Sequence, residues 1–279
     1  MQHHEFNWQN PQGIRTFGQQ WQPETEPKAV VILMHGLGEH SSRYAHVAQA
    51  FSTNGFVLLT CDHMGHGKSD GKRGHVTGYD IFFHEIEHLR SIASQKYPGL
   101  PVFLYGHSLG GNIVLFYTLK KKPNFAGVIA TSPGLLPAID PGPKVIIGKI
   151  LYSIMPAFTM DNGLDISGIS PDPAFVQAYL DDPLNHKKVS TRLGIDLLVN
   201  GKWSLDHAAE FPLPLLLLQG SADRLVDPSA SRAFANKLGE KIHFIEWPGG
   251  YHELHNGPDK VNIIQEIVAW IENVLVKVH

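Results

Sequence analysis

The sequence of 279 residues contains a single cysteine, Cys61, so it can form no intramolecular disulfide. The fold must therefore depend on a hydrophobic core rather than on covalent cross-links. A chain of this length is expected to bury about 70–75% of its unfolded surface, which is enough for a large core. A lone thiol fits a reducing compartment. We therefore expect a cytoplasmic protein.

Excess charge and long apolar runs are also missing. Lys and Arg total 23 and Asp and Glu total 26, so there is no basic excess of the kind that a nucleic-acid partner requires. The longest apolar stretch, residues 145–160, is interrupted by Lys149 and Pro156 and is shorter than the ~20 residues that cross a bilayer. The polar first residues do not resemble a signal peptide. We expect no nucleic-acid partner and at most peripheral membrane contact. The oligomeric state is left open.

Short runs of Val, Ile, Leu and Phe alternate with helical patterns along most of the chain. Six runs predict buried strands, at residues 29–34, 56–61, 101–106, 126–131, 213–219 and 241–247. Helical patterns lie between and after them, at residues 42–53, 79–96, 109–122, 228–238 and 259–277. This alternation predicts an α/β fold with a mostly parallel sheet between helices. Residues 5–9 and 14–21 are expected to add an antiparallel edge hairpin, which gives eight strands.

The alternation stops in a proline-rich segment between about Leu135 and Glu210. Short helical patterns occur there, and no strand is expected. An insertion of about 75 residues is far longer than the usual connection between two strands. We therefore expect residues 1–134 and 211–279 to form the core, and residues 135–210 to form a helical cap over one edge of the sheet.

The strongest chemical signal is the pentapeptide Gly106-His107-Ser108-Leu109-Gly110, which matches G-x-S-x-G. A predicted strand precedes it and a predicted helix follows it, as the nucleophile elbow of an α/β-hydrolase requires. Glycine at positions 106 and 110 would relieve crowding in such a sharp turn. The context favours Ser108 as a nucleophile, and the alternative is a serine in an ordinary glycine-rich turn.

A nucleophilic serine needs a base and an orienting acid, which follow it in the order acid, then histidine, in α/β-hydrolases. Asp223 comes just after a predicted strand, and His252 lies in a loop after the last strand. Asp227 is the second candidate for the acid, although it could instead cap the next helix. His255 and His243 are rival bases, and His243 falls within a predicted strand.

The oxyanion of the reaction needs backbone donors. His35-Gly36-Leu37-Gly38 directly follows a predicted strand, so the N–H of Leu37 could point at the oxyanion together with the N–H of Leu109. This assignment depends on position alone, because backbone donors leave no side-chain signature. The alternative is a plain turn between a strand and a helix.

A second motif, His84-Glu85-Ile86-Glu87-His88, matches the H-E-x-x-H pattern of zinc peptidases. The two histidines fall well off the apolar stripe of this predicted helix, so we expect them to face solvent. No clear third ligand follows. We therefore expect no metal site.

Six blocks of sequence together resemble the monoacylglycerol lipase family, within the lysophospholipase-like branch of the α/β-hydrolases. These blocks are residues 35–44, 62–69, 97–103, 106–111, 219–225 and 251–255. The resemblance implies a catalytic triad of Ser108, Asp223 and His252. It also implies a polar pocket for the glycerol head group, built from Glu39, Arg43, His107, Tyr179 and His255.

We therefore expect a serine carboxylester hydrolase that cleaves monoacylglycerols, a small lipid ester substrate, through an acyl-enzyme on Ser108. This chemistry needs no metal or organic cofactor. The alternatives within the same mechanism are a general short-chain carboxylesterase and a lysophospholipase. Remote alternatives are a zinc peptidase that uses His84 and His88, and an inactive binding module.

The predicted cap contains a broad apolar stripe at helical spacing, formed by Ile146, Ile147, Ile150, Leu151, Ile154, Met155 and Phe158. Such a face could rest in a lipid interface, or it could pack on the core. Because the stripe is wider than one packing contact needs, we expect a mobile lid that meets the membrane transiently.

Overall fold

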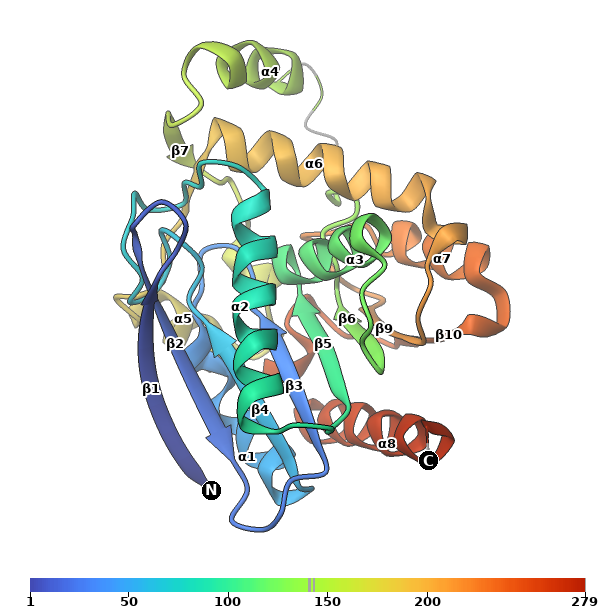
Figure 1. Cartoon of the computed structure of the whole chain (residues 1–279). Coiled ribbons are helices and arrows are strands. Elements are labelled where there is room, and N and C mark those ends of the chain that lie inside the picture. Colours follow the sequence, from blue (N-terminus) through green and yellow to red (C-terminus); the bar gives the residue numbers. More distant parts are fainter. Residues whose placement is uncertain (140–141, 143, 279) are drawn as a thin grey trace.

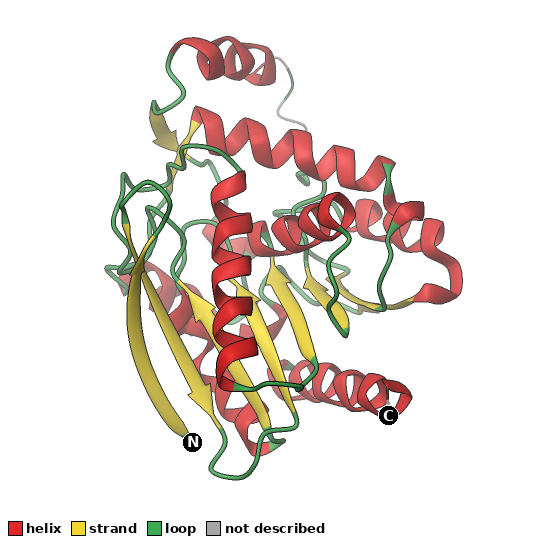
Figure 2. Ribbon diagram, viewed as in Figure 1, coloured by secondary structure: helices red, strands yellow, loops and turns green. Residues whose placement is uncertain are grey.

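An eight-stranded sheet runs through the molecule in the order β1-β2-β4-β3-β5-β6-β9-β10 (Figures 1 and 2). The computed structural model describes residues 1–139, 142 and 144–278. The strands of this sheet are β1 (Gln2–Gln9), β2 (Arg15–Gln22), β3 (Ala29–Met34), β4 (Phe56–Cys61), β5 (Val102–His107), β6 (Gly127–Thr131), β9 (Leu215–Gly220) and β10 (Ile242–Trp247). β1 pairs antiparallel with β2, β2 pairs antiparallel with β4, and the remaining pairs are parallel. The predicted α/β sheet with an edge hairpin is confirmed.

Helices cover both faces of the sheet, which explains why the central strands β3 and β4 are buried at every position (Figure 2). On one face, α1 (Ala45–Thr53) and α8 (Lys260–Val278) pack against alternate strand residues such as Val31 and Leu33. On the other face, α2 (Asp80–Lys96) and α3 (Leu109–Lys121) pack beside β3, where Val30 and Ile32 belong to the core, and α7 (Pro228–Leu238) packs against β9 and β10. The two cores hold the carboxyl ends of β5, β9 and β10 at one edge, where the loops of the candidate site begin.

The segment between β6 and β9 contains more than helices. Its elements are α4 (Lys144–Ile154), β7 (Thr159–Asp161), α5 (Pro173–Asp181), β8 (Lys188–Ser190) and α6 (Thr191–Asp206). The expectation that this segment lacks strands was wrong, because β7 and β8 form an antiparallel pair. A three-residue strand is too short to show an alternating pattern in the sequence. Residues 140, 141 and 143 of the predicted insertion lie outside the described residues.

The apolar stripe of α4 faces away from the rest of the protein. α4 lies above α6, which in turn packs on α3 (Figure 1). Ile146, Ile147, Ile150 and Ile154 are between 57% and 71% exposed. The opposite side of α4 meets α6 through Gly148, where an added Cβ would lie 2.9 Å from Ile195 Cδ1. None of the helices in the described ranges is both long and apolar enough to cross a bilayer.

Candidate active site

The turn between β5 and α3 holds Ser108 in a conformation that few non-glycine residues adopt, with φ 53° and ψ −113°. Close packing on both sides enforces this turn. A Cβ at Gly106 would overlap the carbonyl oxygen of Gly110, and a Cβ at Gly110 would overlap that of Met34 in β3. Only glycine fits at these two positions, as the sequence motif predicts. The turn leaves Ser108 partly exposed, and its side chain makes no capping hydrogen bond to α3.

Three side chains from distant segments form one hydrogen-bonded row. Ser108 Oγ lies 2.8 Å from His252 Nε2, and His252 Nδ1 lies 2.8 Å from Asp223 Oδ2. Asp223 and His252 are both buried. The row has the geometry of nucleophile, base and orienting acid. The structure therefore brings together the three residues that the order of the strands and loops in the sequence predicts as a triad.

Asp223 is held by more partners than the sequence analysis identified. Its Oδ1 accepts the backbone N–H groups of Leu225 at 2.8 Å and Val226 at 3.1 Å. Its Oδ2 accepts an N–H of the Gln219 side chain at 3.0 Å, and Ser231 Oγ orients this amide by donating to Gln219 Oε1 at 2.8 Å. The signal for Gln219 was a polar residue near the end of an otherwise apolar strand.

Burial and hydrogen bonding act in opposite directions on the pKa values of Asp223 and His252. Burial by itself raises the pKa of Asp223, but His252 and the backbone donors outweigh it and bring the pKa below its ordinary value. Burial also lowers the pKa of His252, whereas Asp223, and to a smaller extent Glu253 and Glu39, raise it above its ordinary value. A raised pKa stabilises the imidazolium that forms when His252 takes a proton from Ser108.

The two predicted oxyanion donors lie beside Ser108. Leu109 is the first residue of α3, so its N–H has no acceptor within the helix. Leu37 follows β3 in a turn that approaches the nucleophile, because a Cβ at Gly36 would lie 3.3 Å from Ser108 Cβ. Both leucines line a cavity that also contains Ser108.

Two cavities meet at Ser108, and they differ in the number of polar side chains that line them. One, called the polar cavity below, has a volume of about 20 Å³ and is lined by four polar side chains, Glu39, His107, Tyr179 and Glu253, together with the aliphatic side chains of Leu37, Leu164, Ile166, Ile169 and Leu225. The other has a volume of about 100 Å³ and is lined mainly by aliphatic side chains: Leu37, Leu109, Leu135, Leu136, Leu164, Leu197, Leu198, Leu225 and Val226. Ser108 and His252 belong to both cavities. The first cavity therefore offers hydrogen-bonding side chains next to Ser108, and the second offers an aliphatic surface.

The five predicted head-group residues divide into two sets. Glu39, His107 and Tyr179 line the polar cavity, whereas Arg43 and His255 are not among its wall residues. The Tyr179 hydroxyl donates to the Gly38 carbonyl at 3.0 Å. Burial, with a smaller effect from His252, lowers the pKa of His107 to about 3, so this imidazole is neutral at physiological pH.

The guanidinium of Arg43 pairs with two carboxylates of the protein itself. Its Nη1 lies 2.5 Å from Glu39 Oε2, and its two terminal nitrogens contact the Glu253 carboxylate at 2.8 Å and 2.6 Å. Burial raises the pKa of Glu253, but Arg43 outweighs it and the pKa falls to about 2. The sequence analysis missed Glu253, although it directly follows His252.

His255 lies under an aromatic ring rather than in a cavity wall. It is fully buried, and its ring stacks on that of Tyr44 with the centroids 4.7 Å apart. Neither ring nitrogen has a hydrogen-bond partner within the described part of the chain. Burial lowers the pKa of His255 well below its ordinary value, so the ring is neutral.

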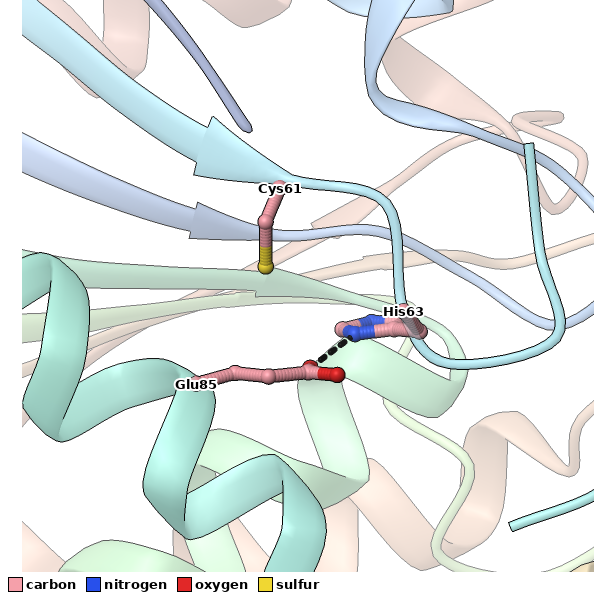
Figure 3. Close-up of side chains that lie close together, drawn as sticks. All are labelled: Cys61, His63 and Glu85. Carbon is pink, nitrogen blue, oxygen red and sulfur yellow. Dashed lines mark hydrogen bonds and ion pairs between the residues drawn. The ribbon is translucent and has the colours of Figure 1, made fainter. Parts of the chain in front are cut away.

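The H-E-x-x-H motif holds no metal-binding arrangement. His84 is exposed, and the ring of His88 stacks on Trp8 with the centroids 4.3 Å apart. Glu85 points to the opposite side of α2 and is buried, which the sequence analysis did not foresee. It contacts His63 close to Cys61 (Figure 3).

Cys61, His63 and Glu85 are the one group of three potential metal ligands found within the described ranges, with their ligand atoms within 4.8 Å of one another. His63 Nδ1 lies 2.6 Å from Glu85 Oε2, and Nε2 lies 3.1 Å from the carbonyl oxygen of His35. Because both ring nitrogens meet oxygen acceptors, His63 would have to give up a hydrogen bond to bind a metal.

The fold and the strand–serine–helix turn define a serine hydrolase of the α/β-hydrolase class. The profile of the Hydrolase_4 family, described as serine aminopeptidase, S33, matches residues 25–259. The chain belongs to this family and is a homologue of the monoacylglycerol lipases. This confirms the family that the motifs predict.

Three relatives illustrate the likeness. The monoacylglycerol lipase of Mycolicibacterium smegmatis is 34% identical over 262 residues, which cover 93% of each chain. The monoglyceride lipase of Homo sapiens is 34% identical over 94% of this chain and 88% of its own. The crystal structure of Paleococcus ferrophilus monoacylglycerol lipase has a TM-score of 0.83 and 33% identity, and it covers 94% of this chain and 98% of its own.

The two candidate acids can be separated by isosteric substitution. Asp223→Asn removes the charge that orients His252, and we expect kcat to fall by about 10⁴-fold because the amide favours the wrong imidazole tautomer. Asp227→Asn is the matched control, since Asp227 caps α7 through the N–H of Ser229 and asparagine caps equally well. Steady-state kinetics of an ester substrate provide the measurement. A larger loss in Asp227→Asn would contradict the assignment.

Arg43 is expected to act mainly on stability. Arg43→Met leaves Glu39 and Glu253 buried without their cation, so we expect the free energy of unfolding to fall by about 3–5 kcal/mol. Arg15→Met is the control, because the Arg15–Asp70 pair is exposed and its loss should cost less than about 1 kcal/mol. Denaturant unfolding tests both. A selective loss of monoacylglycerol turnover relative to a p-nitrophenyl ester, with unchanged stability, would show that Arg43 contacts substrate instead.

Proposed function

We propose that this protein is a serine carboxylester hydrolase that cleaves monoacylglycerols to a free fatty acid and glycerol through an acyl-enzyme on Ser108. The observation that carries the proposal is the junction of a polar cavity and an aliphatic cavity at the Ser108 hydroxyl. A monoacylglycerol has the same division, with a glycerol head on one side of its ester and an acyl chain on the other. Relatives named monoacylglycerol lipases over most of their length support the same substrate class.

In the proposed mechanism, His252 Nε2 accepts the Ser108 proton while Oγ attacks the ester carbonyl carbon. The N–H groups of Leu37 and Leu109 donate to the oxyanion of the tetrahedral intermediate. His252 then donates the proton to the glycerol oxygen, which leaves and yields the acyl-enzyme. Water enters, gives a proton to His252 and attacks the acyl carbon, and the fatty acid leaves as Ser108 regains its proton. Asp223 keeps the Nδ1–H tautomer throughout.

The polar cavity supports a preference for one-chain glycerides. Its walls include Glu39, His107, Tyr179 and Glu253, which would meet the free hydroxyls of a glycerol head group. An alcohol that carries further acyl chains would place hydrocarbon against these buried polar groups, and hydrocarbon, unlike a hydroxyl, forms no hydrogen bond with them. Leu164, Ile166 and Ile169 close this cavity from the segment between β6 and β9. Entry of glycerol therefore requires this segment to move.

The alternative esters fit the two cavities less well. The simple alcohol of a short-chain ester carries no further hydroxyl that could meet the four polar side chains of the polar cavity. The phosphate of a lysophospholipid would bring negative charge next to the carboxylates of Glu39 and Glu253, which share the single cation of Arg43. Both features favour a neutral, hydroxylated leaving group.

The nucleophile and the substrate class can be tested together. We expect a fluorophosphonate probe to label the wild-type protein and not Ser108→Ala, and we expect the same substitution to lower turnover by at least about 10³-fold. Among mono-, di- and trioleoylglycerol, the wild type should prefer the first. The proposal is wrong if folded Ser108→Ala keeps its turnover, or if the trioleoyl substrate is hydrolysed as fast as the monooleoyl substrate.

We further propose that residues 135–210 form a cap over a core of residues 1–134 and 211–279, and that α4 makes transient, peripheral membrane contact. Its four isoleucines present an apolar surface that no other described element covers, and Lys149 is exposed on the same helix. An interfacial helix combines such an apolar face with a cationic side chain in the headgroup layer.

A pair of double variants tests the membrane contact. Ile147→Ser with Ile150→Ser should reduce liposome binding and long-chain turnover, because both side chains are more than half exposed on α4. Val261→Ser with Val276→Ser is the matched control, since these residues are at least as exposed as the two isoleucines and lie on α8. Co-sedimentation with anionic liposomes gives the binding, and a short soluble ester should be unaffected in both variants. Equal liposome binding by all three proteins would contradict the proposal.

A further inference from the structure

A row of buried polar groups lies behind the turn that carries Leu37, outside both cavities. It begins at Glu85 in α2, passes through His63 and ends at His35, the last residue before Gly36 (Figure 3 shows the first two). All three side chains are buried. The proposed hydrolysis of an ester uses none of them directly, yet they occupy hydrogen-bonding positions next to the oxyanion turn.

The hydrogen bonds of His35 define its tautomer. The backbone N–H of His63 donates to His35 Nε2 at 3.0 Å, so this nitrogen carries no hydrogen. Burial, and then His63 and His66, lower the pKa of His35 well below its ordinary value, so the ring is neutral. Its single ring hydrogen is therefore on Nδ1, which donates to the carbonyl oxygen of Gly36 at 2.8 Å.

The carbonyl of Gly36 and the N–H of Leu37 belong to the same peptide unit. In a planar trans peptide these two groups point in opposite directions. A hydrogen bond that holds the Gly36 carbonyl against His35 therefore turns the Leu37 N–H to the other side. Without this hydrogen bond the peptide could rotate and present its carbonyl oxygen, which repels an oxyanion.

His63 and Glu85 fix the position of His35 in turn. The rings of His35 and His63 lie with their centroids 3.9 Å apart, and His63 Nε2 lies 3.1 Å from the carbonyl oxygen of His35. On its other side, His63 Nδ1 lies 2.6 Å from Glu85 Oε2. Glu85 Oε1 accepts the N–H of Met64 at 3.2 Å, which ties the carboxylate to the same loop.

We propose that His35, anchored by His63 and Glu85, is a positioning residue that keeps the Leu37 N–H directed at the oxyanion of the reaction. This inference rests on the proposed acyl-enzyme chemistry at Ser108. It assigns the buried Glu85–His63 pair a role in transition-state stabilisation rather than in metal binding.

Two substitutions of His35 separate its two hydrogen bonds. The amide nitrogen of Asn occupies the place of Nδ1, so His35→Asn can still donate to the Gly36 carbonyl. The amide oxygen of Gln occupies the place of Nε2, so His35→Gln keeps the acceptor for the His63 N–H and loses the donor to Gly36. We expect His35→Gln to lower kcat by about 10²–10³-fold, as for loss of one oxyanion donor, and His35→Asn to stay within about 10-fold of wild type. KM should change little in either.

The inhibition constant of a transition-state analogue reports on the oxyanion donors and does not change when a substitution only lowers the stability of the fold. The tetrahedral adduct of an alkyl boronic acid on Ser108 places an oxygen at the oxyanion position, so its Ki should rise in parallel with the loss of kcat. His66→Asn is the matched control, because His66 is equally buried and its ring lies 5.4 Å from that of His35, but it hydrogen-bonds to the Met64 carbonyl instead. We expect it to lower the melting temperature without changing kcat or Ki.

The inference is overturned if His35→Gln and His35→Asn have the same kcat, or if His66→Asn lowers kcat and raises Ki as much as His35→Gln does. Should His35→Gln fail to fold, Glu85→Gln takes its place, with an expected loss of about 10-fold in kcat at constant KM. Failure of the proposed function would instead show as retained activity in Ser108→Ala, so the two results are distinguishable.

Discussion

The site depends on a tight contact between α3 and β3. Gly110 at the start of the helix lies directly against the carbonyl oxygens of Met34 and His35, at a distance that excludes even a methyl group. This contact brings the nucleophile turn and the oxyanion turn together, although they are about 70 residues apart in the sequence. It also imposes the strained backbone of Ser108, at a cost of about 1–3 kcal/mol that the two cores of the sheet offset.

Buried charge is organised around this contact in three hydrogen-bonded groups. Asp223 orients His252 on one side of Ser108, and Arg43 joins Glu39 to Glu253 behind the polar cavity. Glu85 contacts His63, whose backbone N–H donates to His35 next to the oxyanion turn. Burial opposes ionisation of isolated groups, so each carboxylate requires its own donors. These donors fix the positions of the buried carboxylates around Ser108.

The sequence alone predicts a catalytic residue where the role of that residue follows from its place at the end of a strand. Ser108, Asp223 and His252 each lie in a loop after a recognisable strand, so their convergence could be predicted from the order of elements. Burial of charged residues could not, because it depends on partners from distant segments. Glu85 lies in a helix beside exposed His84, and only its contact with His63 explains why it faces inward. Glu253 and Gln219 were missed for the same reason, and the three-residue strands β7 and β8 were too short to show a pattern.

The central claim is that Ser108 lies between a head-group cavity and an acyl cavity. A crystal structure of the enzyme inactivated by a long-chain alkylphosphonate with a glycerol-like ester group, chosen so that this group is retained on phosphorus, tests it most directly. The account predicts phosphorus on Ser108 Oγ, a phosphonyl oxygen about 2.7–3.1 Å from the N–H donors of Leu37 and Leu109, the alkyl chain along Leu135 and Leu197, and the polar group beside Glu39. Phosphorus on another residue, or an alkyl chain in the polar cavity, would contradict it.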